Sequence, residues 1–237
     1  MIVLKRNRIY KLVINANSIS IADRLLLTQF NNYQGKIPFG MISNVGHTIT
    51  IDLTQSEENI LQDCKSNTRN EIRRAIREDF FFEEVKSYDE FVSFYNSFAE
   101  EKGIDKISNE HLTQYGDSIV LFKSGKNGIT MTMHASAIDK DSHVAILLYS
   151  SSVRFSEDVD KKEIGFSNRF LHYKEFVEFK KRGIQLYDFN GICIDQNDKE
   201  RYSISQFKAA FGGRQVDVLW IMSYPYFLIS KIKKFFT

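Results

Sequence analysis

The sequence predicts a mixed α/β fold, of the α+β or α/β class, with a strand–helix–strand crossover at its centre. Three stretches of chain carry that prediction. Residues 143–149 are almost continuously apolar, as in a strand that is covered on both faces. Residues 167–182 have the spacing of a helix, and residues 184–189 have the composition of a second strand. Two strands joined by such a helix run parallel, with a right-handed connection. We therefore expect both strands in the middle of a sheet that helices flank.

Shorter patterns predict the remaining elements. The capping-box pattern Thr54-x-x-Glu57 predicts a helix start, and Ser87-x-x-Glu90 predicts another. A hairpin is expected across residues 125–128, which include two glycines. The other expected segments are strands at residues 8–14, 47–53, 80–85, 118–122 and 129–138, and a helix at residues 21–30.

Composition indicates a globular chain of two closely packed units. The protein has 237 residues, of which 43% are hydrophobic and 14% aromatic, so it can bury a core and is not a disordered chain. It has only two prolines and no Gly/Ser-rich tract, which leaves no visible linker. We expect residues 1–50 to form a reduced N-terminal α/β unit and residues 51–237 to form the larger domain.

Charge and cysteine content narrow the possible class of protein further. The formal net charge of +2 does not call for a nucleic-acid partner. Cys64 and Cys193 are too few for a disulfide framework and lack the spacing of a metal site, so we expect two unpaired thiols and no bound metal. The sequence shows no secretory leader pattern and no apolar run of 18 residues. We expect a soluble, cytoplasmic protein.

The loop before the central helix is the first candidate binding site. Residues 164–168 are expected to open the helix, where N–H groups without partners and the positive end of the helix dipole favour an anion. We expect Gly165, Ser167 and Asn168 to hold the pyrophosphate of a donor at this point.

Four segments in this order resemble a known family. They are residues 65–73 (KSNTRNEIR), 164–168 (IGFSN), 187–192 (YDFNGI) and 207–213 (FKAAFGG). The resemblance is to the GNAT superfamily of N-acyltransferases, most closely its Fem-type branch, and it covers about residues 52–213. It implies a GNAT-like fold with a mixed, centrally splayed sheet flanked by helices, preceded by a reduced second GNAT-like unit.

The resemblance also implies roles for particular residues. Asn190 lies in the expected splay, where GNAT enzymes hold the pantetheine amides of the donor by backbone pairing. Lys208 matches the lysine of the Fem F-K pair, which implies contact with the donor's phosphates, although a surface lysine is the alternative. Arg69 and Arg73 match the lead-in helix and are expected to bind the phosphates of the acceptor. The alternative for these arginines is a solvated basic face relieved by nearby acids.

Two side chains are candidates for the proton transfer. His134 alternates with apolar residues in the strand at 129–138, so it lies on the polar face and could take the proton of an attacking ammonium. Asp188 ends a strand of the crossover, where open α/β sheets bind ligands. Each also has a plainer interpretation, His134 as an exposed histidine and Asp188 as a structural carboxylate that accepts backbone N–H bonds.

These observations favour one function over two others. The leading interpretation is an N-acyltransferase that moves an acyl group from acyl-CoA to the amine of a dTDP- or UDP-linked amino sugar for surface polysaccharide. The chain resembles GNAT-type sugar N-acyltransferases, including those that use 3-hydroxybutanoyl-CoA, in carrying a reduced first unit. The second is a Fem-type aminoacyltransferase that uses aminoacyl-tRNA and a peptidoglycan precursor. The third is a GNAT module that only binds a nucleotide or partner, because Gly165 alone stands where acetyl-CoA enzymes carry G-x-G/A.

The C-terminal segment has two interpretations. Residues 226–236 mix large apolar side chains with three lysines. The segment could lie on an anionic membrane surface, or it could dock on its own domain with its lysines reaching solvent.

Overall fold

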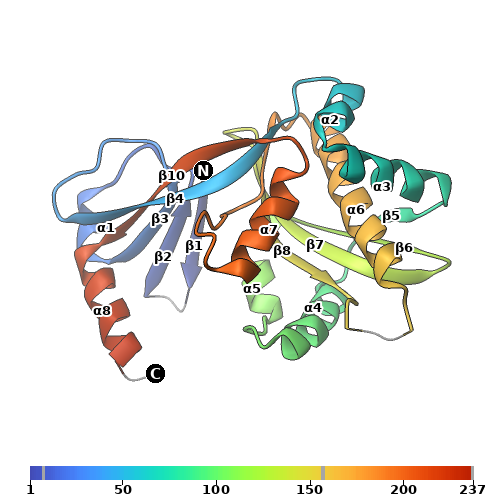
Figure 1. Ribbon diagram of the computed structural model, residues 1–237. Coiled ribbons are helices and arrows are strands. Elements are labelled where there is room, and N and C mark those ends of the chain that lie inside the picture. Colours follow the sequence, from blue (N-terminus) through green and yellow to red (C-terminus); the bar gives the residue numbers. More distant parts are fainter. Residues whose placement is uncertain (7–8, 156–157, 236–237) are drawn as a thin grey trace.

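The structure, a computed structural model, describes residues 1–6, 9–155 and 158–235 and contains one ten-stranded mixed sheet (Figure 1). The strand order is β1-β2-β3-β10-β4-β9-β8-β7-β6-β5. The strands are β1 (Ile2–Arg6), β2 (Tyr10–Ile14), β3 (Leu27–Tyr33), β4 (Met41–Asp52), β5 (Phe81–Val85), β6 (Ile119–Lys126), β7 (Ile129–Asp139), β8 (Val144–Ser152), β9 (Leu186–Asp188) and β10 (Arg214–Ser223). The helices are α1 (Ile21–Leu25), α2 (Glu57–Asp63), α3 (Ser66–Arg77), α4 (Tyr88–Lys102), α5 (Asn109–Thr113), α6 (Lys161–Lys181), α7 (Lys199–Ala209) and α8 (Tyr224–Phe235), with a 3₁₀ turn at Gly116–Ser118.

The predicted crossover is confirmed. β8 leads through α6 into β9, and β8 and β9 pair in parallel, while β9 pairs antiparallel with β4 on its other side. The hairpin is also confirmed. β6 and β7 are joined by Asn127 and Gly128, which both have positive φ, as a two-residue turn of the primed type requires.

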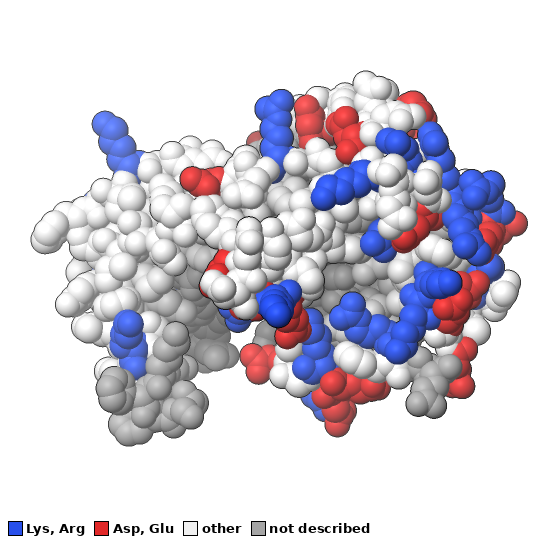
Figure 2. All heavy atoms as spheres, in the orientation of Figure 1, with Lys and Arg blue, Asp and Glu red and all other residues white. Residues whose placement is uncertain are grey.

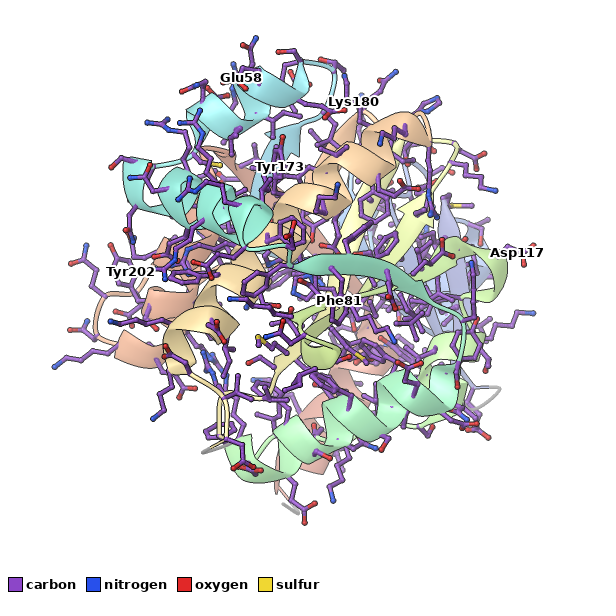
Figure 3. All side chains as sticks on the ribbon, turned by 90° about the vertical axis from the view of Figure 1, so that its right-hand side faces the viewer. Glu58, Phe81, Asp117, Tyr173, Lys180 and Tyr202 are labelled. Carbon is purple, nitrogen blue, oxygen red and sulfur yellow. The ribbon has the colours of Figure 1, made fainter. Side chains whose placement is uncertain are left out.

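Helices cover both faces of this half of the sheet. Figure 3 looks onto the edge strand β5, labelled at Phe81, with α2, α3 and α6 on one side of the sheet and α4 on the other. Along β6 the side chains alternate, so Phe122 packs under α6 and Leu121 packs under α4. The α6 side is the larger core and includes Phe176, Tyr187 and Phe211.

The central helix begins earlier than expected. Its N-cap is Asp160, whose carboxylate accepts from the backbone N–H of Lys162 at 2.9 Å, and the helix starts at Lys161. The expectation that residues 164–168 open the helix is therefore wrong, because an aspartate cap four residues earlier starts it. Gly165, Ser167 and Asn168 are interior residues of α6.

Two other expectations near the N-terminus are wrong. The helix expected at residues 21–30 ends at Leu25, because the chain from Leu27 pairs in parallel with β2 and antiparallel with β10. Strand pairing therefore overrides the helical spacing. Thr54 does not cap α2; it donates to Asp52, and the cap is Ser56, whose hydroxyl accepts from the N–H of Asn59. Ser87 caps α4 as predicted.

The sheet runs without a break across the expected unit boundary. Residue 50 lies inside β4, and β10, from the end of the chain, lies between β3 and β4 (Figure 1). β1 and β2 fold over β7 and β8, since Leu4 and Leu12 share a core with Ala137 and Ile146. The sheet is thus curled. Among the described residues, none of the helices is both long and apolar enough to cross a membrane.

Candidate active site

The two central parallel strands separate at their carboxyl ends. β8 and β9 pair only through Val144, Ala145 and Ile146, whereas β8 continues to Ser152. After β9 the backbone runs along β4 and no longer along β8, because the N–H of Phe189 donates to the carbonyl of Ile49. A bulge in β8 falls at this point, where the β7 partners of Leu147 and Tyr149 are consecutive residues and leave Leu148 unpaired. The predicted splay is confirmed.

A pocket lies inside the curl of the sheet, on the face opposite α6. We call it the inner pocket; its volume is about 260 Å³. Asp188 and Asn190 reach it from the splay, and Trp220 and Thr48 reach it from β10 and β4. Gln29 accepts from the hydroxyl of Tyr10 at 2.7 Å and donates to Asn31 at 2.9 Å. The lining therefore combines aromatic rings with ordered amide groups; the further lining residues include Leu12, Ile14, Asn32, Tyr115, Leu148, Tyr149 and Val218.

A second pocket of about 660 Å³ opens on the α6 side, and we call it the helix-side pocket. It extends from the end of β8 to α6 and α7 and reaches Phe98 and Lys102 of α4. Gly165, Asn168 and Lys208 are among its lining residues. Among the described residues that line it are four further cations, namely Lys102, Arg154, Lys161 and Arg169, against one carboxylate, Glu200. This excess of positive charge suits an anionic ligand.

The segment 188–191 separates the two pockets. Asp188 and Asn190 line the inner pocket, and Phe189 between them lines the helix-side pocket, as alternation along an extended chain requires. Asp188 holds this segment in shape: its carboxylate accepts from the hydroxyl of Thr48 at 2.5 Å and from the N–H of Asn190 at 2.8 Å. Burial raises the pKa of Asp188. Asn190 and Gly191 both have positive φ, so the chain turns sharply here.

Lys208 supports the same segment from the other side. Its ammonium donates to the carbonyls of Phe189 at 2.8 Å, Asn190 at 3.1 Å and Gly191 at 2.6 Å. Burial lowers the pKa of Lys208 to about 8, although Asp188 opposes that shift. Because the three carbonyls occupy its donors, a direct contact between Lys208 and donor phosphates would require these bonds to break.

His134 is fully buried under α6, so the polar face predicted for its strand is not a solvent face. Its Nδ1 lies 3.0 Å from Oε2 of Glu175, and its Nε2 lies 3.2 Å from Oδ1 of Asn168. Asn168 lines the helix-side pocket, and His134 does not. His134 therefore reaches that pocket through Asn168. Ser167, also predicted to bind the donor, is fully buried and shares a hydrogen bond of 2.8 Å with Thr132.

His172 and Glu175 complete this buried group, and the sequence analysis missed both. His172 lines the helix-side pocket, and its Nδ1 lies 3.3 Å from the hydroxyl of Tyr187 and 3.5 Å from Glu175. Burial, reinforced by the charge of His134, lowers the pKa of His172 to about 3. Burial would raise the pKa of Glu175, but the two histidines more than offset it and lower that pKa. His172 is thus a neutral hydrogen-bonding group near pH 7.

The same group has the donor set of a metal site. Ligand atoms of His134, His172 and Glu175 lie within 4.8 Å of one another, and imidazole with carboxylate suits zinc or iron. The hydrogen bonds among these residues and Tyr187 account for the arrangement without an ion.

Arg69 and Arg73 line neither pocket. The guanidinium of Arg69 donates to the carbonyls of Gln62 at 2.7 Å and Cys64 at 3.2 Å, so it caps the end of α2. Arg73 lies 3.6 Å from the carboxylate of Glu58. The structure does not bring them to the splay, and their binding of the acceptor stays a prediction.

Comparisons with known proteins identify the fold. No protein-family model matches the sequence, and no curated protein matches it. Among solved structures, FemX superposes with a TM-score of 0.70 over 94% of this chain and 83% of its own, at 10% identity. The chain has the fold of FemX. L-PGS from Bacillus licheniformis follows with a TM-score of 0.59, 11% identity and coverage of 93% and 81%. The C-terminal domain of a putative lysylphosphatidylglycerol synthetase from Agrobacterium fabrum gives 0.58, 12% identity and coverage of 87% and 72%. The predicted Fem-like fold is confirmed.

Proposed function

We propose that the protein is an N-acyltransferase that moves an acyl group from acyl-CoA to the amine of a nucleotide-linked amino sugar, with dTDP or UDP as the nucleotide. One observation carries the proposal: the two pockets lie on opposite faces of the segment 188–191, where β8 and β9 separate. Two substrates can then approach one point from two sides.

The helix-side pocket is the proposed donor site. Its cations suit the phosphates of CoA, and its volume of about 660 Å³ accommodates an extended pantetheine arm. Beyond Ile146 the edge of β8 no longer pairs with β9, so its backbone groups can bond the amides of that arm. In this proposal Gly165 and Asn168 contact the donor from α6, whereas Asn190, which was predicted to bind the donor, lines the inner pocket and faces the acceptor. Ser167 and Lys208 act indirectly: Ser167 bonds α6 to Thr132 of β7, and Lys208 holds the carbonyls of residues 189–191.

The inner pocket is the proposed acceptor site. Aromatic rings such as Trp220 stack on the faces of sugars, and the amides of Gln29 and Asn31 suit sugar hydroxyls. Asp188 presents a carboxylate to the same space, which favours the approach of an amine. The acceptor amine attacks the thioester carbonyl, the C–N bond forms, the C–S bond breaks, and the CoA sulfur leaves as thiolate. The proton lost by the amine passes to a base or to water.

The second candidate keeps the same geometry and changes the donor. FemX, L-PGS and the putative lysylphosphatidylglycerol synthetase domain share the fold. The resemblance of the sequence to the Fem-type branch implies aminoacyl-tRNA as the alternative donor. In that case the helix-side pocket would hold only the terminal nucleotide and the aminoacyl ester, and the basic side chains around it would contact phosphates.

Trp220 provides a direct test. It is the one tryptophan of the chain and it lines the inner pocket, so its fluorescence reports on that pocket. We expect dTDP- or UDP-linked amino sugars to change this fluorescence in a saturable way. Isothermal titration should then detect acyl-CoA binding that leaves the Trp220 signal nearly unchanged. Binding of aminoacyl-tRNA without binding of acyl-CoA would replace the proposal with the second candidate.

A further inference from the structure

Charge is distributed unevenly between two parts of the molecule. We call residues 1–51 and 214–237 the strand-rich unit; it contains β1 to β4, β10, α1 and α8. This unit carries ten of the 32 Lys and Arg residues but only two of the 30 Asp and Glu residues, for a net charge of +8. The rest of the chain has a net charge of −6. Both acids of the unit have basic partners, Asp23 with Lys11 at 2.6 Å and Asp217 with His47 at 2.8 Å.

Exposed apolar side chains gather in the same unit. Among the described residues, 13 of the 19 large apolar side chains that face solvent belong to it, although it holds fewer than a third of the residues. Phe39 is 96% exposed, Leu25 is 72% exposed and Ile232 is 57% exposed. Exposed apolar side chains mark an interaction site where they lie next to one another on the surface.

Two helices bring these features together. α1 packs against α8, and both cover the ends of strands in the strand-rich unit (Figure 1). Ile21 and Leu25 are exposed on α1, and Leu228, Ile229 and Ile232 are exposed on α8. In the sequence α8 also carries Lys231, Lys233 and Lys234 and no acid. Figure 2 shows one face of this part with few red spheres, whereas red and blue spheres crowd the part built from α2 to α7.

We propose that α8, together with α1, docks the protein on an anionic lipid membrane. A helix with exposed aliphatic residues beside lysines lies in the interface of a bilayer, with its apolar side chains in the acyl region and its cations at the headgroups. Positive charge and exposed apolar side chains together favour an anionic membrane over a second copy of the chain or an RNA. A second copy would bring two units of net charge +8 into contact, and an RNA backbone would gain little from exposed isoleucine and leucine.

Docking through α8 would bring the inner pocket close to the membrane. Tyr226 in the first turn of α8 stacks on Tyr10 with ring centroids 4.9 Å apart, and Tyr10 lines that pocket. The pocket therefore lies near the docking surface. The docking proposal does not depend on the transferase proposal, because it is tested by binding alone.

Co-sedimentation of the whole chain with vesicles tests the proposal. We expect binding to vesicles of phosphatidylglycerol and phosphatidylcholine, weak binding to phosphatidylcholine alone, and weaker binding as salt rises. Each cation near an anionic surface strengthens partitioning by roughly fivefold. Lys231→Glu should therefore weaken it by at least about fivefold. Leu25→Glu combined with Ile232→Glu should reduce it further, because two apolar anchors are lost.

Ile129→Glu is the matched control, since Ile129 is 52% exposed on the other part of the molecule and should leave vesicle binding unchanged. Circular dichroism of each variant verifies its fold. Equal binding by the control and by the Leu25, Ile232 double variant would overturn the proposal. It would also be overturned by the absence of vesicle binding by the wild type, or by a dimer or an RNA complex that these substitutions abolish in place of vesicle binding.

Discussion

Lys208 carries its charge into a largely buried place, where three carbonyls accept from it. Its pKa of about 8 in the folded protein lies below its value of about 10.5 in the unfolded chain. Between pH 8 and 10.5 the unfolded state therefore binds more protons, and the free energy of unfolding contributed by this group rises with pH, by at most about 1.4 kcal/mol per pH unit.

We therefore expect Lys208→Met to flatten this rise. Urea unfolding at pH 7.5, 8.5 and 9.5 compares the two proteins, and the difference between them isolates Lys208 from the other titrating groups. At pH 7.5 the variant should also lose activity, because three carbonyls that shape the splay lose their donor. The same pH slope in both proteins would show that Lys208 is not held with a lowered pKa.

Asp188 has two possible contributions, its hydrogen bonds and its charge. Asp188→Asn keeps an oxygen that can accept from Thr48 and from the N–H of Asn190, whereas Asp188→Ala removes both bonds. We expect the alanine variant to lose about 1–3 kcal/mol of stability and the asparagine variant to lose less. If the charge attracts the amine, Asp188→Asn should raise the acceptor KM at every pH. If both variants match the wild type in stability and in acceptor KM, Asp188 makes neither contribution.

His134 is tested through its shared hydrogen bonds. It contacts Glu175 and, through Asn168, the helix-side pocket. If His134 accepts the proton of the amine, His134→Gln should lower kcat while the donor KM stays near that of the wild type. If His134 only positions Asn168, His134→Gln and Asn168→Ala should raise the donor KM to a similar extent. A kcat and a donor KM of His134→Gln that both equal those of the wild type would leave His134 without either part in the reaction.

At the scale of elements, α6 contains one glycine that lies inside the helix and also lines the helix-side pocket. Gly165 is an interior residue of the helix, and an added Cβ would meet only the Arg169 guanidinium at 3.5 Å. Gly165→Ala should therefore stabilise the protein by about 0.5–1 kcal/mol, since glycine costs that much in a helix interior. Gly165→Leu should extend into the helix-side pocket and raise the donor KM with the acceptor KM unchanged. A donor KM equal to that of the wild type would place the donor elsewhere.

The sequence predicts elements well where local pattern and tertiary packing agree. Residues 143–149 and 184–189 are mostly apolar because α6 covers one face of these strands and β1 and β2 pack on the other, so both strands of the crossover could be found from composition. Leu27 to Phe30 continues a helical spacing from α1, but pairing with β2 and β10 makes it a strand. The pairing with β10 joins segments nearly 200 residues apart, and no local pattern reports it.

Some residues of the candidate site could likewise be predicted from the sequence, and others could not. The segment 188–191 and Lys208 could be placed at the splay because they belong to recognisable motifs. His172 and Glu175 were missed because their contacts come from distant strands: Glu175 bonds to His134, while His172 packs on the ring of His134 and bonds to Tyr187. One local signal was present: both residues fall on the apolar face of α6, with Leu171 and Phe179, and a carboxylate on a buried face needs partners.

At the scale of the whole molecule, the candidate active site and the basic, apolar surface lie on different parts of one sheet. The helix-side pocket and the buried histidines lie around β8, β9 and α6, whereas the basic and apolar surface lies on the strand-rich unit. The inner pocket is lined from both parts. β4 joins the two parts, since its Thr50 pairs with Asp188 of β9 on one side and with Arg214 of β10 on the other. A ligand in the inner pocket contacts both parts at once.

This arrangement predicts how the protein unfolds. β10 lies between β3 and β4, so the strand-rich unit cannot form without the end of the chain, and the continuous sheet should unfold in one cooperative step. Trp220 of β10 reports on the strand-rich unit, and far-ultraviolet circular dichroism reports on all helices and strands. We expect the two signals to give the same urea midpoint. Gly46→Val should lower both midpoints together, because an added Cβ would come within 2.7 Å of the Trp220 ring. A tryptophan transition that precedes the loss of helix would instead show that residues 1–50 and their partners behave as a unit separate from residues 51–237.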